Sequence, residues 1–152
     1  MEALDESTRQ GHRLLQAGIL LFLLALIAGL LVHKFTVPRL GLSVHLLGIM
    51  QGIFLMLIGS LWPKLNLARA PARMGFWLAV YGCYSAWTAN LLAGVWGAGN
   101  PMLPFAAGMA RGSEAQEAII SIALRSAALS LIATALLVLW GLRTSGSNQV
   151  TK

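Results

Sequence analysis

The sequence predicts an all-α integral membrane protein, a four-helix bundle with both termini in the cytoplasm. Two observations carry this prediction. Of the 152 residues, 57% are hydrophobic and only 11% are charged, whereas soluble domains carry about 25% charged residues. In addition, four apolar stretches each have roughly the 20 residues that a helix needs to cross the hydrocarbon core of a bilayer. Helices are expected because a helix satisfies its own backbone hydrogen bonds within lipid.

The four predicted spans cover residues 14–32, 42–61, 74–96 and 118–142. They form one transmembrane domain over residues 14–142, preceded by a cytoplasmic segment (1–13) and followed by a polar tail (143–152) that we expect to be disordered. The first two connections are short and contain proline, which suits turns between antiparallel helices. The third connection is long and rich in Gly and Pro, as lids and re-entrant segments often are.

The distribution of Lys and Arg predicts the orientation. The N-terminus, the second connection and the tail hold seven of the 11 Lys and Arg residues, and the first and third connections hold three. The positive-inside rule then places both termini in the cytoplasm of a multi-pass inner-membrane protein. The net charge of +6 follows from these connections. Since no dense basic block or nucleic-acid motif accompanies it, we expect no nucleic-acid partner.

One ionisable residue, His45, lies three residues inside the second span. Ionisable residues within spans are costly in lipid and are candidates for function. His45 is either an interfacial histidine bonded to a carbonyl or a metal ligand. A single histidine cannot form a closed zinc site, which needs four ligands, and no span contains a carboxylate. One axial imidazole does suffice for haem iron, so haem is the favoured metal group.

Small residues and one further charge surround this candidate ligand. Gly48 and Gly52 share a helical face with His45, and such glycines allow either the close approach of another helix or the docking of a flat ligand. Arg125 lies inside the fourth span, in the same half of the membrane as His45, and it either extends to the interface or pairs with haem propionates. The candidate cofactor-binding residues are His45, Gly48, Gly52, Arg39, Arg111 and Arg125.

The third span is more polar than the others, with tyrosine, tryptophan and asparagine at mid-depth. Aromatic stripes in membrane helices are commonly packing or interface belts. The alternative is a pocket for an aromatic substrate, with hydroxyl and amide groups that orient it. No Ser/His/Asp set, paired carboxylate or Walker loop is present. The candidate catalytic residues are Gln51, Tyr81, Tyr84, Trp87 and Asn90.

The second and third spans resemble a known family. The segments "GLSVHLLGIMQGIFLMLIGSLWPKLNL" and "FWLAVYGCYSAWTANLLAGVWGAG", with the later "QEAIIS" and "LVLWGL", are similar to the hydroxylaminobenzene mutases. A fainter similarity extends to the styrene oxide isomerases, chiefly through a histidine followed six residues later by an amide, as in His45 and Gln51.

The resemblance implies a membrane isomerase that converts a hydroxylaminoarene to a 2-aminophenol. It also implies a haem b cofactor whose ferric iron acts as a Lewis acid, with His45 as the axial ligand, and a trimer of four-helix chains. Three alternatives stay open: an epoxide isomerase of the styrene oxide type, a haem-binding electron-transfer subunit, and a small multidrug transporter. A second strong iron ligand would favour the electron carrier, and proton-driven efflux would favour the transporter.

Overall fold

The computed structural model describes residues 2–145, and every regular element in that range is helical. The prediction of an all-α protein is therefore confirmed for this range. The four long helices are α1 (Glu2–Leu30), α2 (Pro38–Leu61), α3 (Arg69–Trp96) and α5 (Glu114–Ser145). Short elements lie in the three connections: η1 (Val32–Lys34), η2 (Trp62–Lys64) and α4 (Pro104–Ala107).

Each predicted span falls mainly on one long helix, but the helices extend further. Helix α1 begins at Glu2 and takes in the predicted N-terminal segment, whose Glu, Ala, Leu, Arg and Gln residues are good helix formers. Helix α5 ends at Ser145, so residues 143–145 of the predicted disordered tail are helical. The rest of that tail lies outside the described residues.

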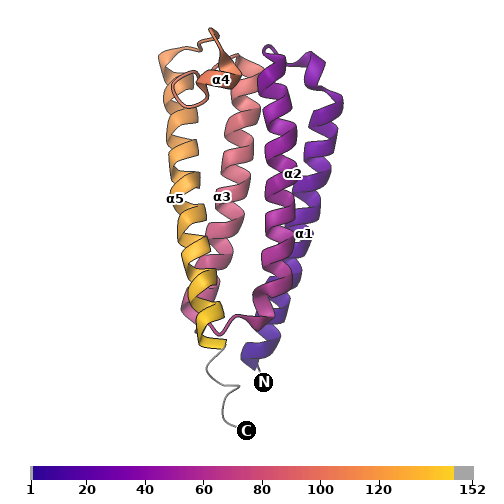
Figure 1. Cartoon of the computed structure of the whole chain (residues 1–152), viewed down its shortest axis with the longest axis vertical. Coiled ribbons are helices and arrows are strands. Elements are labelled where there is room, and N and C mark those ends of the chain that lie inside the picture. Colours follow the sequence, from indigo (N-terminus) through magenta and orange to yellow (C-terminus); the bar gives the residue numbers. More distant parts are fainter. Residues whose placement is uncertain (1, 146–152) are drawn as a thin grey trace.

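The long helices form two antiparallel pairs joined side by side (Figure 1). Helix α1 packs along α2, helix α3 packs along α5, and α2 and α3 join the two pairs. Among the described residues, α5 makes no comparable contact with α1 or α2. The predicted four-helix bundle is therefore an open layer, with α1 and α5 on opposite sides. Helix α1 begins and α5 ends at the same end of this layer, and α4 lies at the other end.

Local signals in the sequence set several helix ends. Pro38 occupies the first turn of α2, where its missing N–H has no cost. Gly97 ends α3 in the left-handed conformation (φ 64°), which glycine adopts without strain. At the start of α5, the backbone N–H of Ser113 donates to Gln116 Oε1 (2.8 Å), and the N–H of Gln116 donates to Ser113 Oγ (3.4 Å). This reciprocal pair is a capping box.

The outer faces of the helices are covered by large apolar side chains. Leu30, Met50 and Leu129 are 77%, 70% and 69% exposed, and a soluble monomer rarely exposes contiguous apolar surface on this scale. Within residues 2–145, segments of three helices are long and apolar enough to cross a membrane: Glu6–Leu30, Pro38–Lys64 and Glu114–Arg143. Helix α3, which holds the predicted third span, has a similar length but is not among these segments in the described range, and it lies between α2 and α5 (Figure 1).

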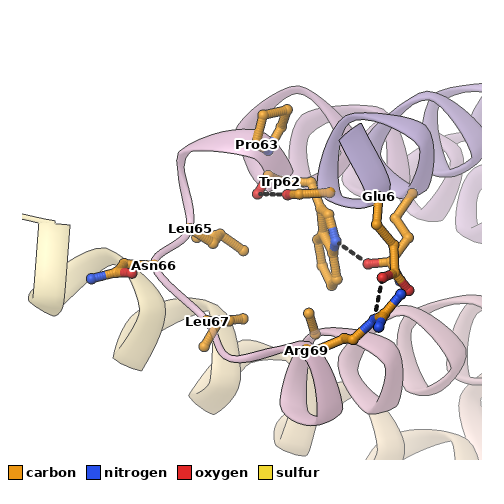
Figure 2. A pocket seen from close by; sticks show the side chains of 10 residues that line it. Glu6, Trp62, Pro63, Leu65, Asn66, Leu67 and Arg69 are labelled. Carbon is orange, nitrogen blue, oxygen red and sulfur yellow. Dashed lines mark hydrogen bonds and ion pairs between the residues drawn. The ribbon is translucent and has the colours of Figure 1, made fainter. Parts of the chain in front are cut away.

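A cluster of contacts ties the start of α1 to the start of α3 (Figure 2). Trp62 is 2% exposed, and its indole N–H donates to Gln10 Oε1 at 2.9 Å. Ser7 Oγ donates to the backbone carbonyl of Trp62 at 3.2 Å, and Arg69 pairs with Glu6. These residues border a cavity of about 210 Å³. Each polar side chain named here already has a partner within this group of residues. We call the group, which joins α1, η2 and α3, the fastened corner.

Candidate active site around His45

His45 belongs to α2 and is half-buried, and its imidazole ring packs against α1. Its Nδ1 is 2.8 Å from the backbone carbonyl oxygen of Ala25. A carbonyl oxygen only accepts hydrogen bonds, so Nδ1 carries the proton and donates. In the neutral ring, Nε2 then holds a lone pair, and no other residue in the described range bonds to it. A metal-binding histidine usually has this arrangement, in which one nitrogen donates to a carbonyl and the other binds the metal.

Gly48 and Gly52, the predicted cofactor-binding glycines, are both buried by neighbouring helices. A Cβ atom at Gly48 would lie 2.6 Å from Ala25 Cβ and from Trp87 Nε1. One at Gly52 would lie 2.8 Å from the carbonyl oxygen of Gly18. Of the two roles considered for these glycines, the structure shows the close helix contact. Within one chain, no space is left on this surface for a macrocycle, because α1 and Trp87 fill it.

Three of the predicted catalytic residues are buried in the interior. Gln51, Trp87 and Asn90 are 7%, 9% and 4% exposed. Asn90 Nδ2 donates to the Ala86 carbonyl of its own helix at 3.0 Å. Gln51 Oε1 and Trp87 Nε1 are the buried side-chain polar atoms that have no partner in the described range. Since an unpaired buried polar atom is costly, this acceptor and this donor are the groups most ready to bind a polar ligand atom or water.

The two predicted tyrosines lie in a different place. Tyr81 and Tyr84 line an open groove of about 440 Å³ between α3 and α5, together with mostly apolar side chains. Tyr81 OH lies 2.8 Å from Ser126 Oγ. Since Ser126 donates to the Ala123 carbonyl, Tyr81 is the donor to Ser126. Tyr84 OH donates to the Ala17 carbonyl of α1 at 2.9 Å. No residue of α2, and therefore not His45, lines this groove.

The three predicted arginines are exposed and lie on different elements of the chain. Arg39 precedes His45 by six residues on α2, about 9 Å along the helix. Arg111 lies in the connection before α5 and borders a hollow shared with Glu114 and Glu117. Arg125 is on α5, which does not pack along α2. Within one chain, therefore, only Arg39 shares a helix with His45.

The long third connection is held by Glu117, a residue that the sequence reading did not single out. Its two carboxylate oxygens accept hydrogen bonds from the backbone N–H groups of Gly99 (2.8 Å) and Gly112 (2.9 Å). One side chain thus fastens both ends of the connection. The Ser113-x-x-Gln116 spacing, typical of a capping box, marks the start of α5 in the sequence, but it does not itself point to Glu117.

No three His, Cys, Asp or Glu side chains gather into a metal-binding group within residues 2–145.

These features define a small helical membrane protein with a few buried polar side chains and a histidine whose Nδ1 is held by a backbone carbonyl. The chain belongs to the styrene oxide isomerase family, whose model matches residues 10–143. It is 48% identical over 140 residues to hydroxylaminobenzene mutase HabB of Ectopseudomonas oleovorans, a match covering 92% of this chain and 85% of that protein. It is 39% identical over 129 residues to hydroxylaminobenzene mutase HabA of the same organism, covering 85% of this chain and 96% of that protein.

The resemblance to the hydroxylaminobenzene mutases and, more distantly, to the styrene oxide isomerases is thereby confirmed. No solved structure matches this chain.

Proposed function

We propose that this chain is a membrane isomerase that converts hydroxylaminobenzene-type arenes to 2-aminophenols. The observation that carries this proposal is the 48% identity to a hydroxylaminobenzene mutase over 92% of the chain. In the reaction the N–O bond breaks and a C–O bond forms at the ortho ring carbon. That carbon loses a proton and the nitrogen gains one. Substrate and product have the same composition, so no electron donor or nucleotide is needed.

We include ferric haem b, held by His45, in the proposal. His45 fits this role because its Nδ1–H is committed to Ala25 and its Nε2 is left to bind iron. The glycine surface beside it is filled, so a haem would have to reach His45 through the part of the side chain that is not buried. When bound, the haem would supply Lewis-acid chemistry that draws electron density from the N–OH group and weakens the N–O bond. Among the predicted propionate partners, Arg39 lies on the same helix as His45.

The remaining roles fall to polar and aromatic side chains of the chain itself. The Nε1–H of Trp87 and the Oε1 of Gln51 have no partner in the described range. Each is suited to bind the substrate hydroxyl, because a hydroxyl both accepts and donates hydrogen bonds. Positive charge that develops on the substrate nitrogen and ring would be stabilised by aromatic faces such as those of Trp87 and Tyr84. Exclusion of water by the apolar surroundings would keep the departing oxygen from exchanging with solvent.

The proposal also covers the membrane topology and the oligomeric state of the protein. We infer four spans, with both termini in the cytoplasm of an inner membrane. The starts of α1 and α3 and the end of α5, which carry Arg residues, lie at one end of the layer (Figure 1), in agreement with the positive-inside rule. A homo-oligomer, a trimer by family resemblance, would cover the edge of His45 and could bring Arg111, Arg125 and the α3–α5 groove of another copy toward it.

Purified protein supplied with haem tests the proposal. We expect a Soret absorption band, together with conversion of hydroxylaminobenzene to 2-aminophenol. Both should be lost in His45→Ala and kept in His33→Ala, which changes an exposed histidine within η1, in the first connection. A colourless protein with full mutase activity would refute the haem assignment. A haem protein without mutase activity would refute the substrate.

The second candidate is an epoxide isomerase, which the name of the matching family model favours. It uses the same residues, because opening an epoxide also develops positive charge beside an aromatic ring. Rapid isomerisation of styrene oxide, with no conversion of hydroxylaminobenzene by the same preparation, would establish this candidate instead.

A further inference from the structure

The ring of His45 lies directly on the backbone of Gly29 in α1. A Cβ atom built at Gly29 would be 2.4 Å from Nδ1 of His45, 2.7 Å from Cε1 and 3.0 Å from Cγ. All three nearest atoms belong to this one ring. Real Cβ atoms almost never approach other atoms so closely, so any side chain at position 29 would displace the imidazole.

The same ring is held by the residue one turn earlier on α1. Nδ1 of His45 donates to the Ala25 carbonyl at 2.8 Å, and residues four apart lie one above the other on a helix. Ala25 therefore supplies the acceptor, and Gly29 supplies the flat surface on which the ring rests. If the ring tilted away from position 29, Nδ1 would move relative to the Ala25 carbonyl, and the bond that fixes the tautomer would be lost.

We propose that Gly29 is a positioning residue for His45, which keeps the imidazole against Ala25 and so presents Nε2 to the iron. The part of this inference that concerns iron rests on the proposed function. The part that concerns the ring does not, because it follows from contacts within the chain.

A double-mutant cycle tests whether a side chain at position 29 would collide with the ring of His45. Gly29→Ala should lower the Tm of the purified protein by about 3–10 °C, because overpacking a close contact is destabilising. In a His45→Ala background the same change should lower the Tm by less than about 2 °C, since the atoms it would strike are gone. If Gly29→Ala fails to fold, the double variant should recover folding. An equal loss in both backgrounds, or no recovery, would overturn the proposal.

Nitrogen NMR of haem-free protein labelled with ¹⁵N-histidine tests whether Gly29 keeps His45 in one tautomer. The His45 signals, assigned with His45→Ala, should show Nδ1 protonated and Nε2 unprotonated. In Gly29→Ala we expect a mixture of tautomers. The matched control is Gly82→Ala, whose Cβ would lie 2.8 Å from the Leu131 side chain between α3 and α5. It also crowds a neighbouring side chain, but away from His45, and should leave the His45 tautomer unchanged.

The absorption spectrum of the ferric protein then tests whether the position of the His45 ring affects iron binding. We expect the Soret band of Gly29→Ala to be weakened or shifted from the wild-type position, and that of Gly82→Ala to match the wild type. If wild-type protein binds no haem, the proposed cofactor is wrong, and the NMR experiment still decides the placement of His45. An unchanged His45 tautomer in folded Gly29→Ala, or the same change in Gly82→Ala, would overturn the proposal.

Discussion

The hydroxyl of Tyr84 donates a hydrogen bond of 2.9 Å to the backbone carbonyl of Ala17, and so ties α3 to α1. This bond spans a part of the layer where the two helices share little packing. The ring of Tyr84 lines the groove between α3 and α5. The residue therefore has two separable parts: a hydroxyl that joins helices and an aromatic face that is open to a ligand.

Tyr84→Phe should separate these parts. Removal of the hydroxyl should lower the free energy of unfolding by about 0.5–1.5 kcal/mol. Conversion of hydroxylaminobenzene should fall by less than about threefold, because the aromatic face remains. Thermal unfolding and a turnover assay on the same preparation check both. Tyr81→Phe, which removes a bond to a serine on the exposed side, should destabilise less. A large loss of turnover in Tyr84→Phe at unchanged stability would mean that the hydroxyl acts on the substrate.

Gly52→Ala and Gly59→Ala form a matched pair on α2. Each new Cβ would lie 2.8 Å from a backbone carbonyl oxygen of α1, that of Gly18 or that of Gly11. We expect each change to lower the free energy of unfolding by about 1–3 kcal/mol through overpacking. Haem content per folded molecule should be the same in both. If Gly52→Ala alone lost haem while remaining as stable as the wild type, Gly52 would contact the cofactor directly.

Glu117→Gln should loosen the long third connection. A glutamine has one carbonyl oxygen where the carboxylate has two, so it cannot accept in the same way from both Gly99 and Gly112. The loss of one charged acceptor should raise the opening of this connection by about ten- to a hundredfold. Limited trypsin digestion at Arg111 measures the opening. Glu114→Gln, a neighbouring exposed acid on the same helix, should be cleaved at the wild-type rate. Equal cleavage of the two variants would show that Glu117 is not the fastening residue.

At the fastened corner, the buried indole should matter more than the ion pair. Arg69 is 74% exposed and Glu6 is 28% exposed, and ion pairs on the surface contribute about 0–1 kcal/mol. Arg69→Ala should therefore change the free energy of unfolding by less than about 1 kcal/mol. Trp62→Phe should cost about 1–3 kcal/mol, since it removes a buried hydrogen bond and leaves Gln10 without its donor. The reverse order of the two effects, measured by thermal unfolding, would contradict this ranking.

The sequence was sufficient to predict the helices, because long apolar stretches in lipid have few alternatives to helical structure. The assignment of His45 as an iron ligand stays a prediction. The sequence did not show that Arg125 would lie on a helix remote from His45, or that Trp87 would cover Gly48. Both depend on which helices pack together. In a membrane, apolar faces are equally tolerated against lipid and against protein, so hydrophobic patterning says little about helix neighbours.

The extent of the α1–α2 contact has a consequence for how the protein is made. These two helices are consecutive, and they meet along their length through glycines on both sides. Their pairing needs nothing from the second half of the chain, so the first hairpin can assemble while the ribosome is still producing α3 and α5. His45 and its two partners on α1 all belong to this early unit. The placement of His45 against Ala25 and Gly29 would thus be complete before the groove between α3 and α5 is synthesised.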